Sequence, residues 1–222
     1  MESAFWHSRW ASDEIGLHQE DVSPLLYRYW DSLRVSPRGL VFVPLCGKST
    51  DMLWLAKHDF HIVGVELDKS SAERFFIENK LESHVDQRHS MRRYRASTLP
   101  ITIYQGDFFN LPKSVIHECD VVLDRGSLVA LPDVTRRAYS EKLKTDLSSN
   151  AEMLLISIEH CLADGPPYSL NHTDINALFG AQYRVGKLGE GRETVNGEGV
   201  QTVAYHLLPW ALSIQSKRER QC

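Results

Sequence analysis

The sequence predicts an α/β fold: a three-layer sandwich around a mostly parallel seven-stranded sheet, with an antiparallel hairpin at the C-terminal edge. Short apolar runs such as 39–44 are typical of strands buried on both faces. Such runs alternate with segments of helical periodicity, and right-handed crossovers then place helices on both faces of a parallel sheet. The last two strand-like runs, 183–188 and 202–208, have no helix between them, so we expect them to pair as a hairpin.

The first part of the chain contains the signals of a helix followed by two strand–helix units. Ser23 followed by Pro24 is typical of a helix N-cap and first turn. Apolar residues at helical spacing follow it: Leu26, Tyr29, Trp30 and Leu33. The remaining elements expected in this part are strands at 39–44 and 61–67 and helices at 49–58 and 69–80.

The alternation continues to the end of the chain, with one exception. Further strands are expected at 101–105, 120–124 and 152–158, and a short helix at 174–179. A longer helix should follow Pro132, because Tyr139, Leu143 and Leu147 share a helical face. Residues 82–97 carry six Arg or His residues and little periodicity, and we expect a loop or short irregular helix there. With no internal repeat or low-complexity linker, the chain is expected to form one domain, 1–222.

Composition excludes several classes of function. The 222 residues carry a formal net charge of −4, which argues against a nucleic-acid partner. The four cysteines form no CxxC pair, so no metal-ligand spacing is visible. The first residues lack the apolar core of a signal peptide, and no stretch approaches a membrane span. We therefore expect a cytoplasmic, monomeric protein without metal or membrane partner, ending in a flexible tail at 211–222.

Four places at the carboxyl ends of the predicted strands are candidate ligand sites, because open parallel sheets bind ligands there. They are the turn 44–49 after the first strand, Glu66 at the end of the second, Gly106-Asp107-Phe108 after the third, and Asp124-Arg125-Gly126 after the fourth. These four places define the predicted site.

The turn at 44–49 has features of two nucleotide-binding motifs but satisfies neither. Gly47-Lys48-Ser49 is reminiscent of a phosphate-binding P-loop, but Phe42 stands where that motif requires its first glycine. The dinucleotide fingerprint needs three spaced glycines, and Gly47 is the only glycine of the turn. Both motifs are therefore disfavoured.

An acid at the end of the second strand suits a different ligand. The carboxylate of Glu66 can accept hydrogen bonds from both hydroxyls of a ribose, and Asp107 and Phe108 can flank an adenine. The alternatives are that Glu66 is an ordinary strand-end acid and that Gly106-Asp107 is common turn chemistry.

The motifs together resemble the thiopurine S-methyltransferase family from Phe5 to about Pro209. Pro44-Leu-Cys-Gly-Lys48 is the most specific of them, because general methyltransferases carry a more glycine-rich loop there. The other matching segments are Phe5-Trp6 with Trp10, Leu17-His18-Gln19, Val63-Gly-Val-Glu66, Asp124-Arg-Gly126 with Leu128-Val-Ala-Leu131, and Gly165-Pro-Pro-Tyr168.

The resemblance implies a Rossmann-like class I methyltransferase fold, with S-adenosyl-L-methionine as methyl donor. Residues 1–35 would form a helical cover over the cofactor. The implied cofactor-binding residues are Trp10, Leu45, Glu66, Asp107, Phe108 and Arg125. Arg125 would also orient the acceptor as the catalytic residue, and Leu17 would line the acceptor pocket.

The acceptor is the least determined part of this prediction. The family usually has phenylalanine where this chain has Leu17, and the segment 160–164 is about two residues shorter than its counterparts. His18 is a candidate proton acceptor, although a lone histidine is more often structural. Three hypotheses remain open: methylation of an aromatic or heterocyclic thiol, methylation of a selenium or tellurium species, and a non-catalytic protein that binds an adenosyl ligand.

Overall fold

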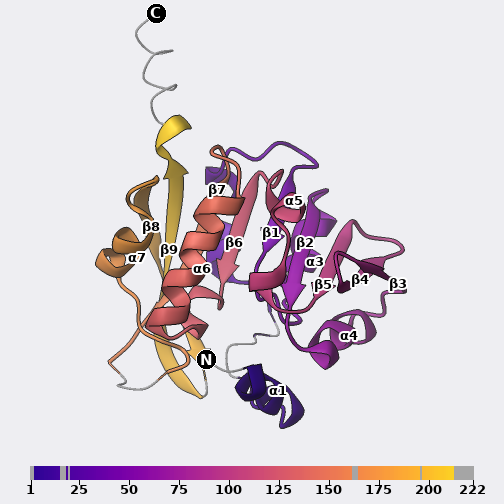
Figure 1. The fold of residues 1–222 in the computed structure, drawn as a ribbon. Helices are drawn as coiled ribbons and strands as arrows, with labels where there is room; N and C mark the ends of the chain where they lie inside the picture. Colours follow the sequence, from indigo (N-terminus) through magenta and orange to yellow (C-terminus); the bar gives the residue numbers. More distant parts are fainter. Residues whose placement is uncertain (1–2, 16–18, 20, 162–164, 196, 213–222) are drawn as a thin grey trace, which may run out of the picture.

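The computed structural model describes residues 3–15, 19, 21–161, 165–195 and 197–212. Within them, nine strands form one sheet in the order β3-β4-β5-β2-β1-β6-β7-β9-β8 (Figure 1). The strands are β1 (Leu40–Val43), β2 (His61–Glu66), β3 (Ser83–Arg88), β4 (Met91–Ala96), β5 (Ile101–Gln105), β6 (Val121–Arg125), β7 (Glu152–Glu159), β8 (Tyr183–Val195) and β9 (Glu198–Pro209).

The centre of the sheet is parallel. From β1 the chain adds β2 and β5 on one side, and then returns to add β6 and β7 on the other. The strand order therefore reverses between β1 and β6, which is where such a sheet opens a ligand crevice at its carboxyl ends.

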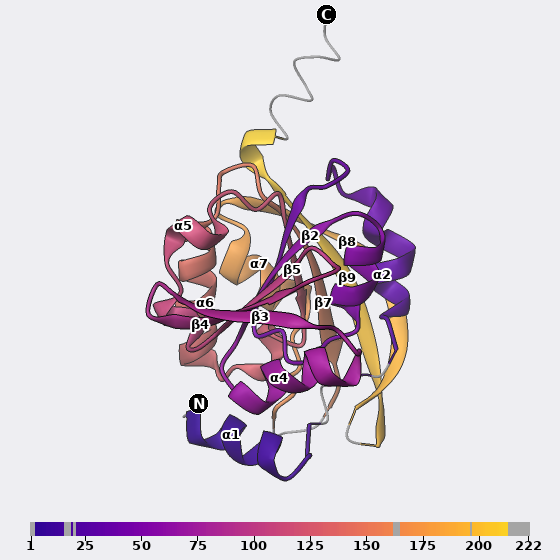
Figure 2. The ribbon, with the colours of Figure 1, turned by 90° about the vertical axis from the view of Figure 1, so that its right-hand side faces the viewer.

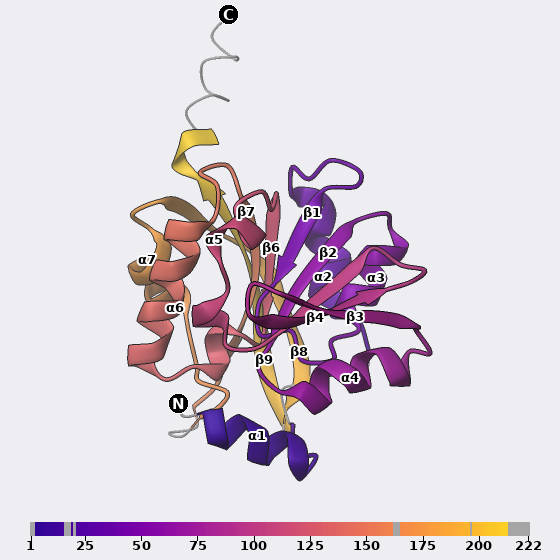
Figure 3. The ribbon, with the colours of Figure 1, turned by 45° about the vertical axis from the view of Figure 1, so that its right-hand side comes forward.

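Helices cover both faces of the sheet (Figure 3). On one face lie α2 (Pro24–Tyr29), α3 (Asp51–Lys57) and α4 (Lys69–Glu78), and on the other α5 (Lys113–Ile116), α6 (Asp133–Asp146) and α7 (His172–Phe179). Each face has its own buried cluster: Met52 and Phe75 belong to the first, and Tyr139 and Phe179 to the second. The predicted three-layer α/β class is confirmed.

The expected loop at 82–97 is wrong: these residues form the antiparallel hairpin β3–β4, and the sheet has nine strands rather than seven. The edge strand β3 is largely exposed, so it lacks the apolar alternation that would have revealed it. Cross-strand charge pairing stabilises the hairpin instead, since the Arg93 guanidinium donates to both carboxylate oxygens of Asp86 at 2.9 and 2.6 Å. His89 and Ser90 make the turn with positive φ of 55° and 62°.

The C-terminal hairpin is confirmed but longer than expected. β8 extends to Val195 and β9 begins at Glu198, so most of the residues between the two expected runs, 183–188 and 202–208, also belong to the sheet. The glycines let α2 approach the strand closely: a Cβ on Gly189 would overlap Tyr29, and one on Gly191 would lie 3.3 Å from Leu25.

The N-terminal region departs from the predicted helix. Helix α2 ends at Tyr29 and continues as the 3-10 turn η1 (Trp30–Ser32). Ser23 makes no side-chain cap; its hydroxyl donates to Glu193 instead. A further helix, α1 (Ser3–Ala11), lies apart from the two helical layers, beyond one end of the sheet (Figure 2).

Among the described residues, no helix has the length and apolar character that a membrane crossing needs. Residues 213–222 of the expected flexible tail lie outside the described residues.

Candidate active site

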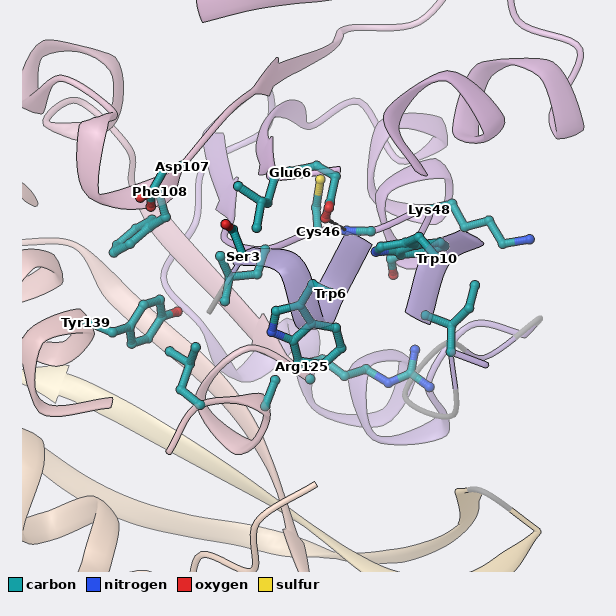
Figure 4. Close-up of a pocket in the computed structure, with 18 of the residues that line it drawn as sticks. Ser3, Trp6, Trp10, Cys46, Lys48, Glu66, Asp107, Phe108, Arg125 and Tyr139 are labelled. Carbon is teal, nitrogen blue, oxygen red and sulfur yellow. Dashed lines mark hydrogen bonds between the residues drawn. The ribbon is translucent and has the colours of Figure 1, made fainter. Parts of the chain in front are cut away.

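A pocket of about 220 Å³ lies at the carboxyl ends of β1, β2, β5 and β6. Helix α1 contributes to its lining, with Trp6 in the middle of the pocket and Trp10 at one end (Figure 4). Lining residues include all four predicted places: Leu45 and Gly47, Glu66, Asp107 and Phe108, and Arg125 and Gly126.

The turn after β1 brings backbone and Trp10 close together. Leu45 and Gly47 both have positive φ, 43° and 53°. A Cβ on Gly47 would lie 3.3 Å from Cζ2 of Trp10, tighter than most real contacts. Glycine is therefore needed here both for backbone conformation and for the approach of the indole. Trp10 is accordingly only 7% exposed.

Glu66 ends β2 as a buried carboxylate held by two backbone donors. The N–H of Asp68 donates to Oε1 at 2.7 Å and that of Gly47 to Oε2 at 2.8 Å. Burial raises the pKa of Glu66 to about 7, although both N–H donors oppose the rise. These two hydrogen bonds tie the end of β2 to the turn after β1 and to the start of α4, and the same side chain lines the pocket.

Asp107 and Phe108 both line the pocket, but their side chains have different surroundings. The Asp107 carboxylate accepts the N–H of Phe109 at 2.9 Å and so caps the 3-10 turn η2 (Phe108–Asn110). The ring of Phe108 is 2% exposed and packs against Phe42 and Tyr139. Phe109, which the sequence analysis did not single out, is 40% exposed and also lines the pocket.

Arg125, the last residue of β6, spans two carboxylates. Its NH1 donates to Asp51 of α3 at 2.9 Å, and its NH2 to Glu193 of β8 at 3.2 Å. Burial opposes the charge, but the two carboxylates raise the pKa of Arg125, so the guanidinium stays protonated. The two contacts use one N–H group on each terminal nitrogen, so three of the five guanidinium N–H groups are not engaged by these ion pairs.

Two polar contacts hold α1, and the turn that follows it, over the pocket. His7 Nδ1 lies 2.6 Å from Oδ2 of Asp68, and Arg74 NH1 donates to Asp13 at 2.8 Å. Both partners, Asp68 and Arg74, belong to the N-cap and body of α4. Although its partial burial acts the other way, the contact with His7 lowers the pKa of Asp68.

The predicted acceptor residues Leu17 and His18 lie outside the described residues. Their neighbour Gln19 lines the pocket, and its side-chain amide donates to the carbonyl of Thr194 at 2.9 Å. Further lining residues were not predicted as such, because hydrophobic periodicity marks the buried face of an element and does not distinguish a pocket wall from packed core. They include Ser3, Trp6, Ala130, Leu131, Thr135 and Tyr139.

The thiopurine S-methyltransferase family matches residues 1–208 of this chain. The chain belongs to the thiopurine S-methyltransferase family. Thiopurine S-methyltransferases from Nitrosospira multiformis and Pseudomonas entomophila are 40% identical over 182 residues and 39% identical over 181 residues. The alignments cover 81% of this chain in each case, and 82% and 83% of the respective relatives. The resemblance drawn from the sequence motifs is confirmed.

Solved structures support the fold of this thiopurine S-methyltransferase family member. A methyltransferase from Methanosarcina mazei, described as SAM-dependent, matches with a TM-score of 0.63 at 12% identity, covering 85% of this chain and 99% of the other. A Burkholderia thailandensis 1,6-didemethyltoxoflavin-N1-methyltransferase, solved with S-adenosylhomocysteine, matches with a TM-score of 0.58 at 11% identity, covering 93% and 86%. The class I methyltransferase fold is therefore confirmed.

Proposed function

We propose that this protein transfers a methyl group from S-adenosyl-L-methionine to a small aromatic or heterocyclic thiol, such as a thiopurine. The observation that carries the proposal is the buried carboxylate of Glu66, which lines a pocket at the carboxyl end of β2. Family membership supports the reaction type, because relatives 37–40% identical are thiopurine S-methyltransferases.

The residues present suit the donor. Glu66 would accept hydrogen bonds from the ribose hydroxyls, and Asp107 and Phe108, together with the more exposed ring of Phe109, would lie beside an adenine. Leu45 and Gly47 would bring backbone close to the ligand, and Trp10 would cover it. Arg125, at the next strand end, would lie between the methionine moiety and the acceptor.

The bound donor supplies an activated methyl group with its own leaving group. The protein therefore needs to align the acceptor sulfur and exclude water, rather than to provide a covalent intermediate. Trp6 and Trp10 of α1 line the pocket and would exclude water from the reacting groups. Arg125, fixed by Asp51 and Glu193, orients the acceptor through its remaining N–H groups.

Turnover on a panel of acceptors tests the proposal. Methyl transfer from radiolabelled S-adenosylmethionine should be measured with a thiopurine, thiophenol, selenite and tellurite. Methylation of both thiols is the expected result. Transfer to selenite or tellurite alone would favour the metalloid alternative, and binding of the donor without transfer to any acceptor would favour a non-catalytic adenosyl-ligand protein.

We further propose that the protein acts on small molecules as a cytoplasmic monomer, without nucleic-acid or membrane partners. The net charge of −4 supports the absence of a nucleic-acid partner, because nucleic-acid binding normally uses a basic surface. Sedimentation at micromolar concentration measures the oligomeric state.

The N-terminal helix α1 should become more stable when the cofactor site is filled. Trp10 already packs over the turn at Gly47, and a ligand beneath it would add further contacts to the indole. We expect amide hydrogen exchange over residues 3–15 to slow when S-adenosylhomocysteine binds, while exchange in α7 stays the same. Equal exchange in both states would contradict the role of α1 as a cover.

The identity of residue 17 should affect the choice of acceptor. The family usually has phenylalanine there, and an aromatic neighbour is worth about 0.5–1.5 kcal/mol to a flat ring beyond simple burial. Leu17→Phe is therefore expected to lower the KM for a thiopurine by roughly three- to tenfold. Steady-state kinetics with a small aliphatic thiol provide the control, since that acceptor cannot stack. A higher thiopurine KM, or equal improvement of both acceptors, would contradict the stacking argument.

A further inference from the structure

The ion pairs of Arg125 determine the charge at the acceptor end of the pocket, which is the part next to Arg125 where the proposed function places the thiol. One guanidinium faces two carboxylates, Asp51 and Glu193, so this cluster carries one negative charge in excess. Among the described lining residues the other cation is Lys48, which pairs with Glu78 at 2.6 Å; its ammonium points away from Trp6 and Trp10 (Figure 4). Neither cation is therefore an unopposed positive charge within the pocket.

Glu193 is fixed by contacts to both of its oxygens. Oε2 accepts from Arg125, and Oε1 accepts from the hydroxyl of Ser23 at 3.2 Å. The backbone N–H of Ser23 donates to Asp51 at 2.9 Å, which joins the two carboxylates through one residue. Of the two carboxylates, Asp51 has the structural role, because its side chain is only 1% exposed. The side chain of Glu193 is 12% exposed.

Glu193 does not itself line the pocket, but its carboxylate contacts Arg125, which does. Its neighbour Thr194 accepts a hydrogen bond from Gln19, which lines the pocket. An acceptor that approaches Arg125 from the pocket therefore meets a guanidinium whose second nitrogen is already bound to a carboxylate. A guanidinium with a free fork would bind a carboxylate through two parallel hydrogen bonds, and Glu193 occupies half of that fork.

We propose that Glu193 determines the charge selectivity of the acceptor end, by disfavouring acceptors that carry an anionic group in addition to the reacting sulfur. This inference rests on the proposed function and specifies its substrate class as thiols that are otherwise neutral or cationic. The physical reason is repulsion in a partly buried site, where charges are screened less than in water. Selectivity of this kind comes from weaker binding of the anionic acceptor and not from a new contact to the neutral one.

Two thiols that differ by one charge test the proposal: thiophenol and 4-mercaptobenzoate. Wild type should show a kcat/KM for thiophenol at least tenfold above that for 4-mercaptobenzoate. Glu193→Gln should raise the 4-mercaptobenzoate to thiophenol ratio at least tenfold, which corresponds to about 1.4 kcal/mol. Glu193→Asp retains the charge and should keep the wild-type ratio within threefold. Glu190→Gln is the matched control, because Glu190 is on the same strand, half exposed and paired with Lys187.

Calorimetric binding of 4-mercaptobenzoate to the complex with S-adenosylhomocysteine provides a second measurement that needs no turnover. Affinity should rise at least tenfold in Glu193→Gln. If wild type methylates neither of these thiols nor a thiopurine, the proposed function fails, while this titration still decides the charge inference. A ratio and an affinity within twofold of wild type in Glu193→Gln would overturn the inference. An equal rise in Glu190→Gln would also overturn it, because the effect would then come from the overall surface charge.

Discussion

Replacing Glu66 with alanine is expected to weaken the binding of S-adenosylhomocysteine by about 2–4 kcal/mol, because two hydrogen bonds to a charged group are lost and each is worth about 1.5–3 kcal/mol before compensation. This corresponds to a decrease in affinity of roughly thirty- to a thousandfold. Calorimetric titration measures it. Glu141→Ala is the control, since the Glu141 side chain is 69% exposed on α6, outside the pocket lining. Unchanged affinity in Glu66→Ala would remove Glu66 from the cofactor site.

The same carboxylate should make ligand binding dependent on pH. Burial raises the pKa of Glu66 to about 7, and the neighbouring charges that act on it are Asp68, which raises the pKa, and His7, which lowers it. Ribose hydroxyls donate to the ionised form, so binding favours proton release. The affinity for S-adenosylhomocysteine should therefore be low below pH 7, increase through pH 7 and level off above it. Between pH 6 and pH 8 it should increase by up to about tenfold. Glu66→Gln cannot ionise and should lose this dependence; a variant with the wild-type profile would show that another group titrates.

Removing the Arg125 guanidinium is expected to have the largest effect on stability. Arg125→Met leaves Asp51 buried without its cationic partner, and breaking a buried ion pair in this way typically costs about 3–5 kcal/mol of unfolding free energy. Urea denaturation measures the loss. Arg137→Met is the matched control, because Arg137 and its partner Asp133 are both more than half exposed and such pairs contribute about 0–1 kcal/mol. Equal losses of unfolding free energy in the two variants would show that burial of the Arg125 ion pair does not increase its contribution to stability.

Arg125→Lys separates the structural contribution of Arg125 from its proposed role in turnover. Lysine retains the charge, but its single ammonium lacks the planar fork that reaches Asp51 and Glu193 together. We expect a lower kcat/KM for the thiol acceptor, with an affinity for S-adenosylhomocysteine within twofold of wild type. Steady-state kinetics and titration of the folded variant measure both quantities. Wild-type kinetics would restrict Arg125 to a structural ion pair.

Local sequence patterns predicted the parallel core of the sheet and the four places around the pocket. Apolar runs such as 39–44 bury both faces of a strand, and this requirement is local to the run. Once the strands are parallel, their carboxyl ends meet at one edge, so residues far apart in sequence, such as Glu66 and Asp107, line the same pocket. Family motifs added the identity of the donor, which no periodicity could have indicated.

The partners of the site residues followed from the tertiary structure alone. Asp51 and Glu193 lie 74 and 68 residues from Arg125 along the chain, and nothing near any of the three predicts their meeting. The hairpin β3–β4 escaped prediction for a related reason: charged cross-strand pairs stabilise it, and such pairs exist only after the strands are aligned. Hydrophobic periodicity records which face of an element is buried. Ion pairs between separate elements depend instead on how those elements pack together, and that information is distributed over the whole chain.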